Sequence, residues 1–318
     1  MQNDKLVDRF GRKVDSFRAS ITSRCNFSCI FCHHEGLTAI PRDELLSPDD
    51  YGFLSLVAKK FGIVNYKLTG GEPLVRKDAH EIVRALNENG LHVTMSTNGY
   101  FLKEKSKDLS EAGLERANVS LHSLNPGTFS YLTGTNGKYL EKVIEGINEA
   151  LSYGIDIKLN FILMNSNKNE LKSIVDFASS KGVNLNLIEL IPLGTPKNVY
   201  EREHFQVKSE FEYLEKVSVK KYIREFQNRP VYVLPNGVEV TVIIGYGNPY
   251  LCSKCSRLRL TPEGRIKTCI FVEDKYVDIL KEIKNRDEDG VAEGLRKAVL
   301  LREPYFKFGG EKNVHQNG

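Results

Sequence analysis

The sequence predicts an α/β protein built as an incomplete (β/α)6 barrel of the triosephosphate-isomerase type. Six short apolar runs rich in β-branched residues recur along the first part of the chain, and amphipathic helical patterns lie between them. Strands that alternate with helices form parallel βαβ units, and six such units in succession favour a partial barrel. A doubly wound open sheet is the alternative that the same alternation allows. In either fold, functional groups are expected on the loops that follow the carboxyl ends of the strands.

The elements follow one another in a regular order. The six predicted strands cover residues 15–23, 62–68, 91–97, 116–122, 155–163 and 183–190. The sequence SPDD at 47–50 is typical of a helix start and predicts a helix that ends near residue 61. Apolar residues at i, i+3, i+4 and i+7 indicate three more helices, which begin at Ala79, Leu140 and Leu171. Two helices are predicted between residues 275 and 301, on either side of the sequence KNRDEDG.

The composition excludes several classes of protein. The 318 residues are 41% hydrophobic and 27% charged, which is typical of a soluble globular protein with one large or two smaller domains. The N-terminal sequence has no apolar secretion signal and no long apolar run occurs, so a cytoplasmic protein without a membrane span is expected. The net charge of +4 is too small to predict nucleic-acid binding, but an anionic small substrate is compatible with it.

The six cysteines form two sets of three. The first cysteine set is Cys25, Cys29 and Cys32, and the second cysteine set is Cys252, Cys255 and Cys269. Disulfides are not expected in a reducing cytoplasm, so metal binding is the leading interpretation. Three thiolates suit a [4Fe-4S] cluster with one open iron, which the spacing favours for the first set. Structural zinc normally takes four ligands, with His33 or His34 as candidates for a fourth, and the spacing of the second set favours neither metal.

Other polar motifs follow predicted strands. In TGGEP, residues 69–73, adjacent glycines let the backbone approach a ligand closely, and Glu72 can accept a hydrogen bond from an ammonium group; a tight turn is the alternative. The sequence STNG at 96–99 and the pair Ser120 and Ser123 offer hydroxyls at the same rim, or simply begin capped helices. Lys158 lies inside a predicted strand, where an unpaired ammonium is costly unless it faces the barrel interior and an anion.

These motifs together resemble a known superfamily. The spacing C-x3-C-x2-C with Phe31 before the third cysteine, followed by GGEP, resembles the radical S-adenosylmethionine (SAM) enzymes. Four longer segments resemble the GTP 3′,8-cyclase family of molybdenum cofactor biosynthesis: DRFGR at 8–12, FRASITSRCNFSCIFC at 17–32, KLTGGEPL at 67–74 and CSKCSRLRLTPEGRIKTC at 252–269. This resemblance implies a partial barrel over residues 1–195 and a C-terminal extension over 196–318 that carries a second iron-sulfur cluster and binds GTP.

The resemblance implies two [4Fe-4S] clusters and SAM as cofactors. The first cysteine set would hold the cluster whose open iron chelates SAM, and one electron from it would release a 5′-deoxyadenosyl radical. The second cysteine set would hold the cluster whose open iron binds guanine. The expected SAM contacts are Phe31, Gly71, Ser120 and Ile191, the last of which replaces a methionine that is common in the family.

The implied reaction is the conversion of GTP to (8S)-3′,8-cyclo-7,8-dihydro-GTP after hydrogen abstraction at C3′. The expected GTP contacts are Arg18, Lys67, Thr97, Lys158, Arg257, Leu258 and Arg259, and no catalytic side chain is expected beyond cluster and substrate ligands. Guanidinium groups donate two hydrogen bonds to phosphate, and the alternation of Arg257 and Arg259 would place both on one face of a strand. Asn186 stands where the family has a phosphate-binding arginine.

The resemblance also implies partners. These are GTP, an electron donor such as a reductase, ferredoxin or flavodoxin, the pathway neighbour cyclic pyranopterin monophosphate synthase, and a second copy in a homodimer, with neither nucleic acid nor membrane. Family members end in a Gly-Gly tail that enters the active site, a part that Gly309-Gly310 or Asn317-Gly318 would play here. Two alternatives stay open: a radical SAM enzyme with one auxiliary cluster that acts on another substrate, such as a peptide maturase, and a zinc-stapled binding module.

Overall fold

The core of the protein is a parallel sheet in which sequential strands lie side by side. The computed structural model describes residues 5–36, 44–272 and 274–305, so both predicted tail positions, Gly309-Gly310 and Asn317-Gly318, lie outside the described residues. The central strands are β1 (Ser16–Thr22), β2 (Asn65–Gly70), β3 (His92–Thr97), β4 (Arg116–Ser120), β5 (Asp156–Leu163) and β6 (Asn184–Glu189). Each pairs in parallel with the next, which confirms the α/β class. The order excludes the doubly wound alternative, because that fold reverses its strand order.

The C-terminal part of the chain extends both edges of this sheet. At one edge, β9 (Glu239–Ile243) runs parallel to β6 and is followed by antiparallel β8 (Arg229–Val233) and β7 (Lys220–Arg224). At the other edge, β10 (Arg257–Leu260) runs parallel to β1 and is followed by antiparallel β11 (Arg265–Lys267) and β12 (Tyr276–Asp278). The order within the described residues is β12-β11-β10-β1-β2-β3-β4-β5-β6-β9-β8-β7, so the sheet is open.

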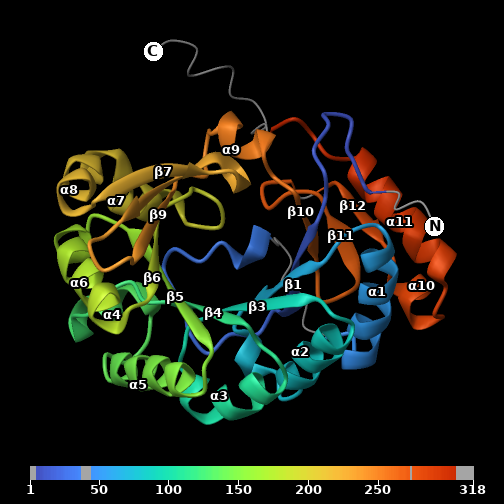
Figure 1. Cartoon of the computed structure of the whole chain (residues 1–318), viewed down its shortest axis with the longest axis horizontal. Coiled ribbons are helices and arrows are strands. Elements are labelled where there is room, and N and C mark those ends of the chain that lie inside the picture. The colour runs from blue at the N-terminus through green and yellow to red at the C-terminus, as the bar shows by residue number, and fades with distance from the viewer. Residues whose placement is uncertain (1–4, 37–43, 273, 306–318) are drawn as a thin grey trace.

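Helices cover the outside of the sheet (Figure 1). They are α1 (Pro48–Lys60), α2 (Ala79–Glu88), α3 (Leu102–Glu111), α4 (Pro126–Thr133), α5 (Tyr139–Ser152) and α6 (Leu171–Lys181). α1 begins as predicted: the Ser47 hydroxyl accepts from the Asp50 amide while the Asp50 carboxylate accepts from the Ser47 amide, which is a capping box. The predictions do not include α3 or α4. Asn125 caps α4 by accepting from the amides of Gly127 and Thr128.

The remaining helices belong to the C-terminal part. They are α7 (Lys197–Glu203), α8 (Phe211–Val217), α9 (Pro249–Ser253), α10 (Leu280–Lys284) and α11 (Glu288–Leu300). The last two confirm the helices predicted on either side of KNRDEDG. Among the described residues, no helix is both long enough and apolar enough to cross a membrane.

The two faces of the sheet differ in chemistry because side chains alternate along each strand. One face is apolar and packs against the helices; its core residues include Phe17, Leu68, Met95, Val119, Leu159 and Leu187. The other face, called the inner face below, carries polar side chains. Arg18 pairs across the sheet with Lys67 on one side and with Arg259 on the other, so these three cations share the inner face.

Candidate active site

The first cysteine set lies on the loop that leaves the carboxyl end of β1, which Figure 1 shows inside the arc of strands. The loop is anchored to the end of α4: the Ser28 amide donates to the Thr133 carbonyl at 3.0 Å, and the Ile30 amide donates to the Leu132 carbonyl at 3.1 Å. Gly134 follows with φ +62°, and a Cβ there would lie 2.5 Å from the Ser28 carbonyl oxygen. The cysteine loop is therefore fixed by backbone contacts at a position where only glycine fits.

The thiols of the two sets have different electrostatic surroundings. None of the six cysteines forms a disulfide. Burial and the neighbouring cysteines raise the pKa of Cys29, and burial also raises that of Cys32. Burial alone would raise the pKa of Cys255 as well, but the Arg257 guanidinium and a backbone hydrogen bond bring it below its ordinary value. Metal binding would therefore have to offset the raised pKa of the first-set thiols, whereas the surroundings of Cys255 lower the cost of forming its thiolate.

The two histidines after Cys32 have separate surroundings. His33 is half-buried, and desolvation lowers its pKa to about 4; its Nδ1 accepts a hydrogen bond from the Glu35 amide at 3.1 Å. The Nδ1 of His34 lies 3.6 Å from the Cys32 sulfur. Among the described residues no group of three His, Cys, Asp or Glu side chains is arranged to hold a single metal ion. The assignment of metal to the cysteine sets therefore depends on two observations: the donors are cysteine sulfurs, and each set lies together, the first on one loop and the second around one cavity.

The GGEP motif packs directly beneath the first cysteine set. The Glu72 amide donates to the Arg24 carbonyl at 2.8 Å, and a Cβ on Gly71 would lie 2.3 Å from that carbonyl oxygen. The Glu72 carboxylate accepts from the Leu74 amide at 3.0 Å, the Thr97 hydroxyl at 2.7 Å and the Asn98 amide at 2.6 Å. Burial raises the pKa of Glu72 to about 7 even though these donors oppose it. Gly71 thus makes close packing possible, and the Thr97 hydroxyl is already bound to Glu72.

Of the other predicted SAM contacts, Phe31 belongs to a small apolar cluster. Phe31 is 8% exposed and packs with Leu132, Met164 and Leu190. Its ring meets the ring of His122 edge to face, with centroids 4.8 Å apart. His122 accepts from the Ile162 amide at 3.1 Å through Nδ1, and burial lowers its pKa to about 3, so it is neutral. Ser120 ends β4, and Ile191 follows β6 by two positions. All of these positions lie at the carboxyl ends of strands, as predicted.

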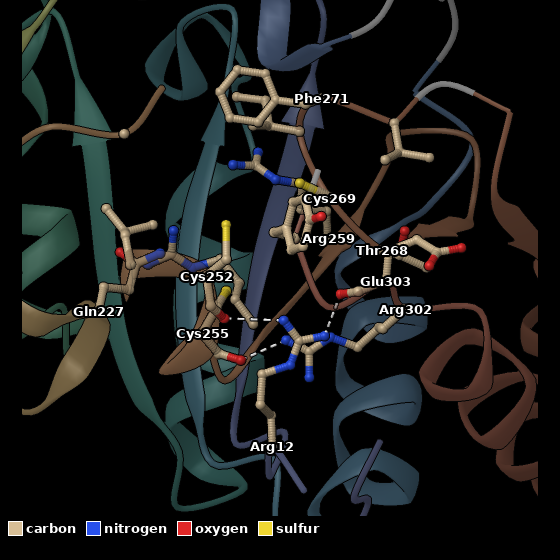
Figure 2. Close-up of a pocket in the computed structure, with 16 residues that line it drawn as sticks. Arg12, Gln227, Cys252, Cys255, Arg259, Thr268, Cys269, Phe271, Arg302 and Glu303 are labelled. Carbon is tan, nitrogen blue, oxygen red and sulfur yellow. Dashed lines mark hydrogen bonds between the residues drawn. The ribbon is translucent and has the colours of Figure 1, made fainter. Parts of the chain in front are cut away.

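The second cysteine set lines one open cavity (Figure 2). Cys252 lies in α9, Cys255 follows it, and Cys269 follows β11. The Cys255 amide donates to the Cys252 carbonyl at 3.1 Å, which closes a turn between the two. Arg257 and Arg259 line the same cavity. Because Leu258 between them is fully buried on the opposite face of β10, only its backbone is available to a ligand.

The inner face of the sheet carries a group of buried cations beside this cavity. Burial and repulsion from Arg18 lower the pKa of Arg257 to about 10. Burial and repulsion from Arg18, Arg257, Arg229 and Lys158 hold the pKa of Lys67 well below its usual value. Lys158 is 6% exposed and donates to the Thr241 hydroxyl at 3.0 Å; burial and repulsion from arginines lower its pKa to about 8. Cations gathered in this way would be stabilised by a bound anion.

Glu35 is a site residue that the sequence analysis missed. It lies in the short 3-10 helix η1 (His34–Gly36) with φ +54°, and it is 7% exposed. Its carboxylate accepts from Arg18 Nε at 3.0 Å, Arg18 Nη2 at 2.8 Å, Arg259 Nη1 at 2.6 Å and the Thr69 hydroxyl at 2.9 Å. Burial by itself raises the pKa of Glu35, but the two guanidiniums outweigh it and hold that pKa well below its usual value. Two of the predicted phosphate ligands are therefore paired with an acid.

Arg229, at the start of β8, is a second residue that the sequence analysis missed. Its Nε is buried and has no hydrogen-bond partner in the described part of the chain. Its guanidinium carbon lies 5.1 Å from the centroid of the Phe226 ring, and that of Arg257 lies 5.2 Å from the same centroid. Burial, and then repulsion from Arg257 and Arg224, lower the pKa of Arg229 to about 9. An arginine before a proline in a short strand gives no sequence signal of this environment.

The two cysteine sets are connected through η1. Gly36, with φ +70°, lies so close to the residue after Cys269 that a Cβ would be 2.1 Å from the Ile270 carbonyl oxygen. The Gly36 carbonyl also accepts from the Lys267 ammonium, and the preceding residue, Glu35, binds Arg259. The segment that begins with the first cysteine set therefore ends against the wall of the second.

Comparisons with known proteins agree with this geometry. Residues 19–178 match the family described as Radical SAM superfamily, and residues 183–308 match the one described as Molybdenum Cofactor Synthesis C. A Saccharolobus solfataricus protein named "Probable GTP 3′,8-cyclase" is 42% identical over 311 residues, which are 95% of this chain and 99% of that protein. A Metallosphaera sedula protein of the same name is 39% identical, over 95% of this chain and 97% of its own. The crystal structure of Streptococcus suis SuiB bound to S-adenosylmethionine covers 95% of this chain and 78% of its own, with a TM-score of 0.66 and 14% identity, which shows a shared fold.

An open parallel sheet with a three-cysteine loop after its first strand, together with the family match over that region, defines a radical SAM protein, for which SAM and a [4Fe-4S] cluster are the implied cofactors. Within that superfamily the chain belongs to the GTP 3′,8-cyclase family, because it is 42% identical to a member across nearly the whole of both chains. The resemblance predicted from the sequence is thus confirmed.

Proposed function

We propose that the protein converts GTP to (8S)-3′,8-cyclo-7,8-dihydro-GTP, the first step of molybdenum cofactor biosynthesis. The observation that carries this proposal is the group of buried cations on the inner face of the sheet. Arg259 binds Glu35, three positions after Cys32, and with Arg257 it also lines the cavity that holds the second cysteine set. A small polyanion bound there would lie within reach of both cysteine sets.

The cysteine sets fit two [4Fe-4S] clusters, each with three protein ligands. None of the six cysteines is in a disulfide, one set is held on a single loop, and the other lines one cavity. When bound, the cluster of the first set and SAM would supply a 5′-deoxyadenosyl radical. The division into a radical SAM region, 1–195, and an auxiliary-cluster region, 196–318, follows from this assignment.

The protein's own residues would bind and orient the two small molecules. Arg257, Lys67 and Lys158 would bind the triphosphate, since they have the inner-face position and the buried charge that favour phosphate. Arg18 and Arg259 would join them to the extent that Glu35 releases their guanidiniums. The guanine would face the second cysteine set, where the backbone at Leu258 is also available.

SAM would lie beside the first cysteine set. The backbone at Phe31 and Gly71 would contact it, with Ser120 and Ile191 at the adjacent strand ends. The Thr97 hydroxyl, bound to Glu72, would reach GTP only after it rotates away from that carboxylate, so we assign it a supporting part. The enzyme would further need a reductase, ferredoxin or flavodoxin as electron donor and would pass its product to cyclic pyranopterin monophosphate synthase; a homodimer is the assembly that the family implies.

An anaerobic assay of the cluster-reconstituted protein with SAM, dithionite and GTP tests the proposal. Mass spectrometry should detect 5′-deoxyadenosine together with the cyclised nucleotide, and Cys29→Ser should abolish both. Cys269→Ser should abolish the cyclised product while the first cluster is retained. Deoxyadenosine without a cyclised nucleotide in the unmodified protein would overturn the proposal and favour a radical SAM enzyme with another substrate, such as a peptide.

A further inference from the structure

The N-terminal DRFGR segment, residues 8–12, makes a compact turn around one buried carboxylate. The side chain of Asp8 is 0% exposed. Its Oδ1 accepts from the amides of Phe10 at 2.9 Å and Arg12 at 3.0 Å. Its Oδ2 accepts from Arg12 Nε at 2.7 Å and lies 2.9 Å from Nη1 of Arg302, which follows α11. Asp8 thus holds two arginines from opposite ends of the chain.

Both arginines direct their other nitrogens at the second cysteine set. Arg12 Nη1 donates to the Cys252 carbonyl at 3.0 Å, and Arg302 Nη2 donates to the Cys255 carbonyl. Arg12 also donates to the carbonyls of Glu303 at 2.5 Å and Pro304 at 3.0 Å. Figure 2 shows the two guanidiniums side by side below the sulfurs of Cys252 and Cys255. The carbonyls of two of the three proposed ligands are therefore bound by guanidinium groups that share one carboxylate.

The local structure of the second set depends on such contacts. α9 spans only five residues, so its last carbonyls have few helical partners of their own. Arg12 donates to the Cys252 carbonyl near the end of α9, and Arg302 donates to the Cys255 carbonyl beyond that end; their side chains are 8% and 3% exposed. Two buried guanidiniums with one carboxylate leave a net positive charge beside the thiols, which favours anionic sulfur ligands. Packing alone would require neither the bonds to the cysteine carbonyls nor the excess of charge.

We propose that Asp8, Arg12 and Arg302 form a clamp that positions Cys252 and Cys255 for the second iron-sulfur cluster and stabilises its anionic charge. These are positioning residues, since they act through the backbone of the ligands. The inference rests on the proposed function in so far as the second cysteine set is taken to hold a cluster. It gives the DRFGR segment a role that is independent of the GTP contacts.

The test uses full-length protein that carries Cys25→Ser, Cys29→Ser and Cys32→Ser, so that only the second cluster can form. Asp8→Asn, Arg12→Gln and Arg302→Gln are each added to this background, and iron, sulfide and the electron paramagnetic resonance spectrum of the reduced cluster are measured. We expect each substitution to lower cluster occupancy at least several-fold and to alter the spectrum of any cluster that remains. Its reduction potential should be lower in the two arginine variants, which lose a positive charge, and higher in Asp8→Asn, which loses a negative one. Arg116→Gln is the matched control, because Arg116 is a half-exposed arginine paired with Asp156 away from the cavity.

Conservative variants keep the test decisive if a substitution impairs folding. Arg12→Lys keeps the charge beside Asp8, but its three N–H groups cannot replace the four hydrogen bonds that Arg12 donates to Asp8 and three carbonyls. Occupancy should therefore fall less than in Arg12→Gln while the spectrum still changes. In the background with all first-set cysteines present, the first cluster should load normally in every clamp variant, which reports an intact fold. Unchanged occupancy, potential and spectrum in all three clamp variants would overturn the inference. If the triple-serine background itself binds no iron, the proposed second cluster fails instead, and the clamp proposal fails with it.

Discussion

The carboxylate of Glu35 and the guanidinium of Arg259 form an ion pair at 2.6 Å, across 224 residues of sequence. The same carboxylate binds Arg18, so one acid compensates two of the cations that are proposed to bind triphosphate. Lys67 and Arg229 have no such acid among their principal electrostatic neighbours, whereas Glu35 is a minor one for Arg257, and the pKa of each of the three is lowered. The site thus contains cations that are paired with a carboxylate, near the first cysteine set, and cations that are not paired with one, deeper on the inner face.

Replacement of Glu35 by Gln should make the protein more dependent on GTP for stability. The buried guanidiniums of Arg18 and Arg259 lose their carboxylate, and removal of one partner from a buried pair is typically destabilising by about 3–5 kcal/mol. A bound triphosphate supplies the missing negative charge. Without nucleotide the melting temperature should therefore fall, and the rise on addition of GTP should exceed that of the unmodified protein.

Guanosine is the matched ligand for this measurement, since it lacks the triphosphate. It should raise the melting temperature equally in Glu35→Gln and in the unmodified protein. Equal stabilisation of both proteins by GTP would show that Glu35 and the triphosphate do not share the two arginines.

Arg229→Gln should weaken GTP binding at least tenfold while guanosine affinity stays the same. The Nε of Arg229 is buried without a hydrogen-bond partner in the described chain, and its guanidinium shares the Phe226 ring with that of Arg257. A phosphate oxygen would satisfy this donor, and a hydrogen bond to a charged group contributes about 1.5–3 kcal/mol. Equilibrium binding to anaerobic protein without SAM measures the effect.

Arg224 serves as the control for this variant. It ends the edge strand β7 and its residue is exposed, although it contributes to the positive potential around Arg229. Arg224→Gln should reduce GTP affinity only slightly. A larger loss in Arg224→Gln than in Arg229→Gln would mean that general electrostatic attraction, and not a direct contact, dominates at this edge.

A comparison of the predicted strands with those of the structure shows which parts of the site can be predicted from the sequence. Strands β1 to β6 begin and end within a few residues of the predicted runs, because the period of two and the turn residues are local signals. The alternation of Arg257 and Arg259 is a local signal too, and it correctly places both on one face of β10. Glu35 could not be found in this way. Its carboxylate reaches Arg259 only because the backbone turns at φ +54° and because β10 returns from the C-terminal part to pair with β1.

GTP affinity should decrease as the pH rises through about 8. Burial, with repulsion from Arg224, Arg116 and Arg229, lowers the pKa of Lys158 to about 8, while Glu239 opposes the shift. Below that pH Lys158 is charged before GTP binds; above it, binding must first take up a proton. The affinity should therefore fall by up to about tenfold for each pH unit above 8. Burial and neighbouring cations also hold the pKa of Lys67 well below its usual value, so Lys67 is a second group whose charged form GTP would favour.

Lys158→Met separates the two lysines. The variant should bind GTP more weakly at pH 7 and should lose the change of slope near pH 8, because the titrating ammonium is gone. Binding is measured from pH 6.5 to 9.5 at constant ionic strength. A slope near pH 8 that persists in Lys158→Met would assign the proton to another group.

Asp50→Asn should destabilise the fold by about 2 kcal/mol without changing the active site. Asp50 caps α1 and binds two cations from the far end of the chain: its carboxylate accepts from Lys284 at 2.5 Å and from Arg286 Nη1 at 2.7 Å. Burial alone would raise the pKa of Asp50, but Lys284, Ser47 and Arg286 lower it to about 2 from 3.8, and a difference of that size corresponds to the stated free energy. Since the pKa is lower in the folded than in the unfolded state, this contribution is complete above about pH 4 and is lost only as the pH falls toward 2. The difference in free energy of unfolding between Asp50→Asn and the unmodified protein should therefore be constant from pH 5 to 8, as measured by urea unfolding.

Asp49→Asn is the matched control: Asp49 lies in the same first turn but is exposed, so its replacement should cost no more than the weak interaction with the helix dipole. Equal destabilisation by both substitutions would mean that the link between α1 and the turn before α11 contributes nothing beyond the charge at the start of α1.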